Sequence, residues 1–285
     1  MIFQGVMERF GIDIYVWTNV AGAIAAMLCA IAMILLAWRR HARAGTATTW
    51  PSFNPLKYLN KDERRKFNPV ALLLCFGAAY AVLLLTLGVM PRLLSPVYVM
   101  GSLVFMEGEV SFASGVLFFM PAALLLALLF PGNGRPTRQL ELFMPVLALQ
   151  HVFNRLACFF GNCCFGVPSR FGHAFPEGSV PAIAYGTGTR LFPNQLIESS
   201  VMLLCFAVIL LLHFRGKQTL PIFPLVFGAT GFLLGFAMSS FWQVLQPLFG
   251  FTYPGPFTHL LIFGIGLVFL VLQIVKHKHN AAARL

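Results

Sequence analysis

Four polar residues recur along one apolar segment of the chain: His151, Arg155, Cys158 and Asn162. Their spacings of four, three and four residues follow the helical repeat, so a helix would carry all four on one face. An arginine near the middle of a membrane-spanning helix costs about 2.5–3.5 kcal/mol on insertion scales, and it normally faces a protein interior or a water-filled cavity and has a partner. This polar stripe therefore predicts a functional site inside the molecule.

Arg155 is the residue of this stripe that points most directly to a ligand. It follows Glu141 by fourteen residues, or about 21 Å of helix. The guanidinium should therefore lie within about 10 Å of the opposite edge of a hydrocarbon core about 30 Å thick. There it can hold a lipid phosphodiester through two parallel hydrogen bonds. The alternative is an ion pair with Glu198, which we expect in the first turn of the following helix at a similar depth.

His151 allows two interpretations. Neutral imidazole is available near neutral pH, so His151 can act as a general base. It can equally be a buried histidine that is hydrogen-bonded to a neighbouring helix. Asn162, Asn194 and Gln195 supply amides at the same membrane level, where such groups either join helices by hydrogen bonds or contact a ligand.

Three of the six cysteines fall beside the stripe. Cys158, Cys163 and Cys164 lie near His151 and His173 in the sequence, which suggests zinc or a disulfide. The spacing Cys-x4-Cys-Cys is not a recognised zinc pattern, however, and adjacent cysteines seldom bridge each other without strain. We therefore expect no metal and no other cofactor, and we interpret these thiols as packing or reactive groups, with a disulfide as the alternative.

The elements that must position these residues are membrane-spanning helices. Hydrophobic residues make up 58% of the chain and charged residues only 10%, whereas soluble proteins carry about 25% charged residues. A helix needs about 20 mostly apolar residues to cross a membrane. We therefore expect an all-α integral membrane protein in which residues 1–285 form a single transmembrane domain. The sequence offers seven such segments, at residues 15–38, 69–90, 110–130, 140–163, 195–212, 220–245 and 257–275.

The basic residues predict the orientation of these helices. If the spans alternate in direction, 15 of the 20 Lys and Arg residues fall on one side, which the positive-inside rule assigns to the cytoplasm. This predicts an outside amino terminus, a cytoplasmic carboxyl terminus, a cytoplasmic loop at residues 44–68 and a long outer-face loop without obvious structure at residues 165–193. The net charge of +11 then reflects topology and contact with anionic inner-leaflet lipid, so it is no argument for a nucleic-acid partner.

Three stretches of the sequence carry a family resemblance. They read Arg-Leu-Ala-Cys-Phe-Phe-Gly-Asn-Cys-Cys-Phe-Gly at 155–166, Phe-Gly-His-Ala-Phe-Pro-Glu-Gly-Ser at 171–179 and Phe-Pro-Asn-Gln-Leu-Ile-Glu-Ser at 192–199. Their order and spacing resemble the signature region of the prolipoprotein diacylglyceryl transferases. The seven-helix layout with an external amino terminus is similar to that family as well.

This resemblance implies a phospholipid-dependent transferase in the inner membrane of a bacterium. The family transfers a diacylglyceryl group from phosphatidylglycerol to a cysteine thiol of an exported prolipoprotein, without a metal or a covalent enzyme intermediate. The implied partners are therefore an anionic phospholipid and a prolipoprotein. The alternatives are a relative that uses another lipid or acceptor, and a non-catalytic lipid-binding or transport protein. Transporters tend to show paired broken helices in two corresponding halves, whereas the polar residues here concentrate in one helix and its following loop.

The resemblance also assigns roles to individual residues. Arg155 falls on the family's essential arginine and Gly166 on its signature glycine, whereas Gln195 and Glu198 fall on a Gln-Leu-Tyr-Glu element. It implies that Arg155, together with Arg190, holds the donor phosphate and stabilises the leaving glycerol phosphate. Glu198, Gln195 and also Asn162 would orient this arginine and the head group.

The chain departs from the family pattern at Cys158 and Cys163, where better-known members read Asn and Glu, and at three further positions. Ala113 stands where an external motif usually holds an essential histidine, Ser240 where a late helix usually carries an arginine, and Phe192 where a histidine is common. Glu107 and Glu109 lie beside the remnant of that external motif, shortly before Ala113. A carboxylate there can replace the missing histidine as a proton acceptor; the alternative is a pair of solvated loop residues.

Overall fold

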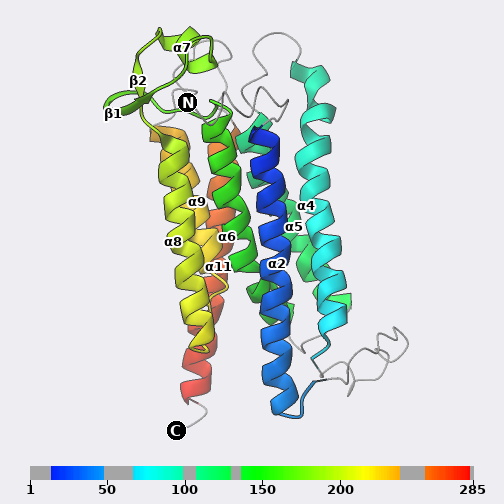
Figure 1. Ribbon diagram of the computed structural model, residues 1–285. Coiled ribbons are helices and arrows are strands. Elements are labelled where there is room, and N and C mark those ends of the chain that lie inside the picture. Colours follow the sequence, from blue (N-terminus) through cyan, green and yellow to red (C-terminus); the bar gives the residue numbers. More distant parts are fainter. Residues whose placement is uncertain (1–13, 48–66, 99–106, 130–135, 238–253, 283–285) are drawn as a thin grey trace.

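The computed structural model describes residues 14–47, 67–98, 107–129, 136–237 and 254–282, and the described chain is mostly long helices (Figure 1). Each of the seven apolar segments expected from the sequence overlaps one of these helices. They are α2 (Ile14–Arg43), α4 (Pro69–Tyr98), α5 (Glu107–Leu129), α6 (Pro136–Phe160), α8 (Asn194–Phe214), α9 (Ile222–Ala237) and α11 (Pro254–Ala282). Between α6 and α8 the chain forms β1 (Pro168–Ala174), α7 (Val180–Tyr185) and β2 (Arg190–Leu191).

The helices identify a multi-pass membrane protein. Five of them, α2, α4, α6, α8 and α11, contain described stretches that are long and apolar enough to cross a membrane. In α5 and α9 the described apolar stretches are shorter, at Gly115–Leu129 and Ile222–Leu234. The fold is thus an all-α membrane fold apart from one small sheet, and the number of seven spans stays a prediction.

Several helix ends differ from the expected spans. The sequence predicts that the second span ends at residue 90, whereas α4 continues to Tyr98, so the connection that follows it is shorter than expected. The fourth was expected to reach residue 163, but α6 ends at Phe160. Periodicity in the sequence does not specify where a helix stops, because the last turn depends on local backbone hydrogen bonds.

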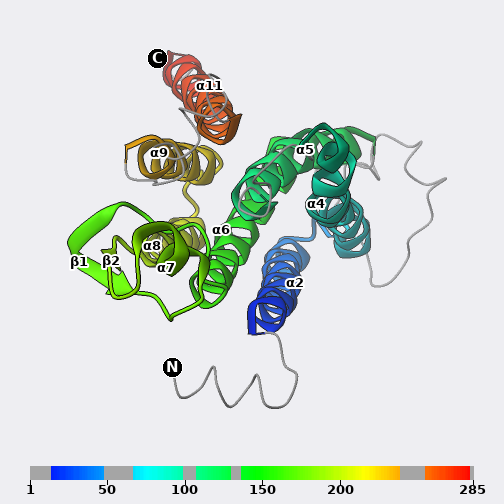
Figure 2. The ribbon, with the colours of Figure 1, turned by 90° about the horizontal axis from the view of Figure 1, so that it is seen from above.

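Helix α6 occupies the centre of the bundle (Figure 2). It packs against α2, α5, α8 and α9, and most of its residues are buried. Among the five candidate spans it is the least apolar and the most buried. A helix with several polar side chains is stable in a membrane only where other helices cover it, so the polar stripe itself explains this central position.

Close packing joins α6 to its neighbours. Gly22 of α2 lies directly against Phe153 and Gln150 of α6, where a larger residue would not fit. On the side of α4, the hydroxyl of Tyr80 donates a hydrogen bond of 2.7 Å to Oε1 of Gln150. The ring of Phe76 packs 4.9 Å from that of Phe143. These contacts fix the depth and rotation of the helix that carries the stripe.

The segment 165–193 is ordered, so the expectation of a loop without structure is wrong. Strands β1 and β2 pair antiparallel with Ala174 opposite Arg190, and both Pro168 and His173 align with Leu191, which marks a bulge. Leu191 packs with Phe165 and Phe175 in a small hydrophobic cluster. We call the segment 165–193 the cap, and it lies over one end of α6 and α8 (Figure 1).

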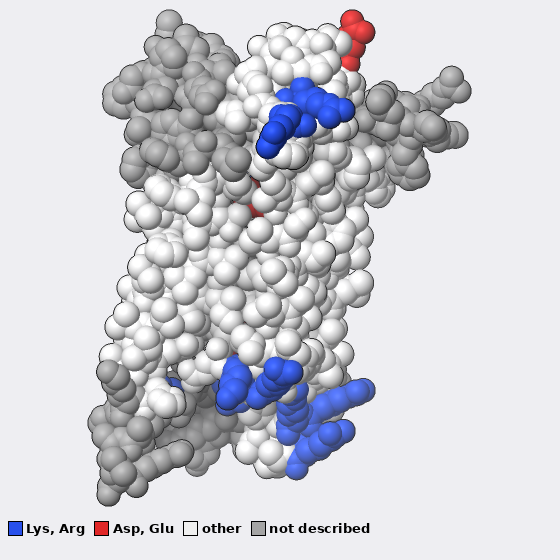
Figure 3. All heavy atoms as spheres, turned by 90° about the vertical axis from the view of Figure 1, so that its left-hand side faces the viewer, with Lys and Arg blue, Asp and Glu red and all other residues white. Residues whose placement is uncertain are grey.

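The sequence predicts a cytoplasmic loop at residues 44–68, and the described residues 44–47 and 67–68 at its two ends lie at the opposite end of the bundle. Its two ends meet through a parallel bridge between Ala47 and Phe67, and the ring of His41 stacks on Phe67 at 4.7 Å. Residues 48–66 lie outside the described part of the chain. Figure 3 shows Lys and Arg side chains gathered at the two ends of one face, and the band between them is white apart from one small acidic patch.

Candidate functional site

Glu198 joins the two most informative residues of the polar stripe. Its Oε1 lies 2.8 Å from Nε2 of His151 and its Oε2 lies 2.7 Å from Nε of Arg155. Glu198 is in the second turn of α8, and the other two residues are one turn apart on α6. All three side chains are at most 3% exposed. We refer to this group as the Glu198 cluster.

The surroundings of the cluster are apolar on the side of His151. Its ring centroid lies 4.6 Å from that of Phe112 in α5 and 4.8 Å from that of Phe227 in α9. A buried ion pair is stable only when both charges have close partners, and the removal of one partner typically costs about 3–5 kcal/mol. The cluster therefore requires all three of its members.

Helix α8 is also bound to α6 by amide and hydroxyl groups. Ser199 donates a hydrogen bond of 3.2 Å to the carbonyl oxygen of Val152. Gln195 donates through Nε2 to the carbonyl oxygen of Cys163, in the turn that follows α6. Both Asn194 and Gln195 are buried at the start of α8. The three residues place Glu198 at the level of the Arg155 side chain.

The prediction that Asn162 shares the helical face of the stripe is wrong. Because α6 ends at Phe160, Asn162 lies in the following turn, where its φ is 54°. Asparagine is one of the few residues that adopt this left-handed conformation readily. Asn162 is partly exposed beside the cap, whereas Cys158, in the last turn of α6, is fully buried.

The turn after α6 brings three thiols together. The Sγ atoms of Cys158, Cys163 and Cys164 lie within 4.8 Å of one another, and we call this group the three-cysteine cluster. Such a group has the donor set for a soft metal ion, although tetrahedral zinc needs a fourth ligand. Interaction with the side chain of Cys158 raises the pKa of both Cys163 and Cys164.

Gly166 lies where two backbone segments approach each other closely. Its N–H donates a hydrogen bond of 2.8 Å to the carbonyl oxygen of Phe192. A Cβ at this position would lie 2.7 Å from that oxygen and 2.9 Å from Oδ1 of Asn194. Only glycine fits here without a shift of the chain, so the structure gives Gly166 a packing role next to the Glu198 cluster.

Arg190 is not part of the buried cluster. It is exposed on β2, opposite Ala174, whereas Arg155 is buried in α6. His173 is also exposed, and its ring packs 5.4 Å from that of Phe159. The structure thus groups His151, Arg155, Glu198, Gln195 and Asn194 and leaves Arg190 on the surface of the cap.

The family model of the prolipoprotein diacylglyceryl transferases matches residues 55–272, which is more than half of the chain and includes every residue of this site. The chain belongs to the prolipoprotein diacylglyceryl transferase family. A search of the curated proteins finds no match. Membership supports a transferase that acts on lipids and lipoproteins in a membrane.

Of the three positions Ala113, Phe192 and Ser240, where the chain departs from its family, Ala113 and Phe192 lie within the described residues. Ala113 lies in α5 and is fully buried, next to Phe112, which packs on His151. Glu107 and Glu109 belong to the first turn of α5, so their expected placement in a loop is wrong. The third position, Ser240, lies outside the described residues.

Sequence reasoning missed His259. This histidine is buried in α11, and its ring lies 4.9 Å from that of Phe227, which also contacts His151. Gly231 of α9 faces the His259 ring so closely that a Cβ would overlap it. The signal was available, because a histidine inside an apolar span is as unusual as the arginine that drew attention to α6.

Proposed function

We propose that this protein transfers a diacylglyceryl group from an anionic phospholipid, phosphatidylglycerol, to the cysteine thiol of a prolipoprotein. The Glu198 cluster carries this proposal, because it combines a phosphate-binding cation, a carboxylate that orients it and a potential base in one buried site. Both carboxylate ion pairs among the described residues belong to this cluster.

In this proposal Arg155 holds the phosphodiester of the donor lipid. A guanidinium has five N–H donors in a planar fork, and the ion pair with Glu198 brings Nε to the carboxylate. Its terminal nitrogens can bind two phosphate oxygens and stabilise the negative charge that develops on the leaving glycerol phosphate. Gln195, Asn194 and Asn162 supply amides for the head group, and Arg190 on the cap attracts it.

His151 is the proposed general base. When the N–H at Nε2 donates its hydrogen bond to Glu198, the lone pair of the ring is on Nδ1. That nitrogen is buried and has no hydrogen-bond partner among the described residues. It can accept the proton of the acceptor thiol while the new C–S bond forms at the glyceryl carbon. The C–O bond to the phosphate breaks as the C–S bond forms, and glycerol phosphate leaves with the bonding electron pair.

The proposed setting is the inner membrane of a bacterium. The basic residues support a cytoplasmic carboxyl terminus and a cytoplasmic position for residues 44–68, with seven spans and an outside amino terminus. The cap formed by residues 165–193 then covers the Glu198 cluster from the outer face, where prolipoproteins arrive. In this arrangement the whole chain, 1–285, works as one transmembrane domain without a cofactor.

The second candidate is a relative that binds the lipid without this transfer, or that uses another acceptor. Ala113 favours it, because it replaces a titratable residue with a methyl group close to His151. A protein that retains Arg155 and Glu198 can still hold a lipid phosphate. The two candidates therefore share the lipid site and differ in the chemistry.

The test uses purified protein, phosphatidylglycerol and a peptide with a lipobox cysteine. The transferase proposal predicts release of glycerol phosphate and a peptide that gains one diacylglyceryl group, both abolished in a peptide with serine in place of the cysteine. Bound phosphatidylglycerol without peptide modification would instead favour the second candidate. Absence of both would overturn the lipid site.

A further inference from the structure

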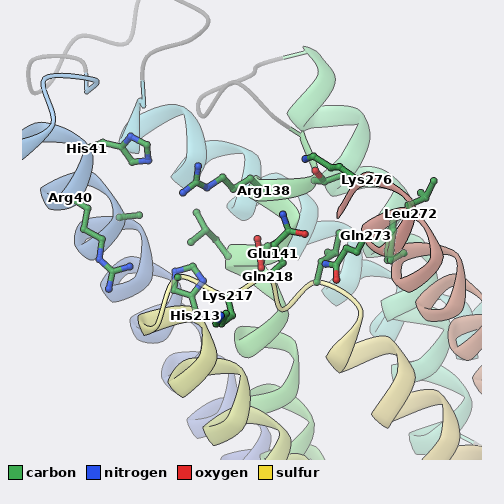
Figure 4. Close-up of a pocket in the computed structure, with 16 residues that line it drawn as sticks. Arg40, His41, Arg138, Glu141, His213, Lys217, Gln218, Leu272, Gln273 and Lys276 are labelled. Carbon is green, nitrogen blue, oxygen red and sulfur yellow. The ribbon is translucent and has the colours of Figure 1, made fainter. Parts of the chain in front are cut away.

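A second candidate site lies at the end of the bundle opposite the Glu198 cluster. The ends of α2, α8 and α11, the start of α6 and the α8–α9 connection enclose a cavity of about 400 Å³. Its volume falls within the range of small-molecule sites, about 300–1,000 Å³. Figure 4 shows the polar side chains that surround it, among them Arg40, Arg138, Glu141, His213, Lys217 and Lys276.

The cavity is strongly basic. Four of its lining side chains are Lys or Arg and one is a carboxylate, so the formal balance is three positive charges. The carboxylate of Glu141 is already engaged, since its Oε1 accepts hydrogen bonds from the backbone N–H and the hydroxyl of Thr219. Within the described residues, both carboxylate ion pairs involve Glu198 at the other end. The Glu141 carboxylate, which also interacts with Arg138, therefore offsets only one of the four positive charges that line the cavity.

These charges come from separate elements that face one space. Arg40 is held against the ring of Phe214, with its Cζ 5.6 Å from the ring centroid. Arg138 projects from α6, and Lys276 projects from α11 on the far wall (Figure 4). Arg and Lys side chains on different helices can contact a phosphate from several directions. A single row of surface lysines would contact it from one side.

The cavity continues into an apolar surface. Phe269 and Leu272 of α11 line it, and an adjoining cavity of about 460 Å³ shares Lys276 and extends along Leu270 and Ile274. The flank of α11 here is exposed, with Leu272 at 58% and Ile274 at 48%. In a membrane such a surface faces acyl chains. A ligand with a phosphate and two hydrocarbon tails matches both parts better than a free phosphate does.

We propose that this cavity binds the phosphate head group of an anionic phospholipid, with the acyl chains along α11. On the topology proposed above this end faces the cytoplasm, where anionic lipids concentrate and basic pockets between helices bind their head groups. Arg138 and Arg155 are seventeen residues apart on α6, about 25 Å along the helix axis. The cavity is therefore separate from the site proposed for catalysis and does not depend on it.

The test measures how tightly phosphatidylglycerol and phosphatidylcholine are retained by purified protein, with native mass spectrometry as the readout. Arg138→Gln and Lys276→Gln each remove one charge from the cavity. Arg39→Gln is the matched control, since Arg39 is exposed at the same end of α2 but does not line the cavity. We expect each cavity variant to bind phosphatidylglycerol about fivefold more weakly, and the control and phosphatidylcholine binding to be unchanged.

Two further measurements identify the ligand and the site. Inorganic phosphate at millimolar concentration should not displace the lipid; displacement would show a site for free anions and overturn the lipid assignment. The fivefold difference between Arg138→Gln and Arg39→Gln should persist in an Arg155→Lys background, whatever the activity of that variant. Equal lipid retention by both cavity variants and the control would overturn the proposal. Unfolding midpoints in phosphatidylcholine establish that each variant is folded.

Discussion

The substitution Arg155→Lys tests whether the arginine acts through its geometry or only through its charge. Lysine keeps the positive charge close to Glu198, so the buried pair can persist. It lacks the planar fork, and one ammonium group must serve both the carboxylate that now lies 2.7 Å from Nε and the donor phosphate. Loss of one such transition-state contact costs about 2.7–4 kcal/mol, so we expect turnover to fall about 100-fold to 1,000-fold.

Substitution of Arg155 should affect the stability of the fold differently from its turnover. Arg155→Lys retains a partner for Glu198, and we expect a modest change in the unfolding midpoint. Arg155→Ala leaves the Glu198 carboxylate buried beside His151 alone, so it should destabilise the protein by about 3–5 kcal/mol in addition to abolishing turnover. The contrast between the two variants separates catalysis from folding.

The assay follows glycerol phosphate release from phosphatidylglycerol in the presence of a lipobox peptide, with thermal unfolding measured in the same detergent. Arg170→Lys is the matched control, because Arg170 is exposed on β1 and packs over the ring of Phe171 at 4.6 Å. It should retain wild-type turnover. An Arg155→Lys enzyme with wild-type turnover and lipid binding would refute the bidentate role, and the site would need another phosphate ligand.

Three other predictions concern packing, metal and topology. Gly166→Ala should lower the free energy of unfolding by about 1–3 kcal/mol, because the added Cβ would lie 2.7 Å from a carbonyl oxygen. The control Gly77→Ala, at a position with open space around it, should leave the unfolding midpoint unchanged or higher. Equal unfolding midpoints for the two variants would contradict the packing role of Gly166. Purified protein should contain less than one zinc ion per chain, because the three-cysteine cluster offers three thiols and no fourth ligand within 4.8 Å among the described residues; stoichiometric metal that Cys163→Ser removes would contradict this. In sealed cells an impermeant thiol reagent should label a cysteine introduced at Gly186 and miss one at Gly45, and equal labelling would argue against the proposed orientation.

The sequence by itself determined the class of the protein and the position of its helices. A composition of 58% hydrophobic and 10% charged residues permits only a membrane fold, and each of the seven apolar segments overlaps a helix. It also required that Arg155 be buried with a partner, because lipid cannot solvate a guanidinium. These conclusions follow from the sequence because each depends only on the residue types within one segment of the chain.

Only the tertiary structure decided which groups meet. Glu198 is 47 residues from His151, and helical periodicity defines the face of α6 without identifying the helix that covers it. The departure of Asn162 from that face depends on a backbone turn at φ 54°, and the basic cavity exists because the ends of three helices and the start of a fourth converge. Contacts of this kind arise from the packing of separate segments, because their energy depends on distances that spacing along the chain does not contain.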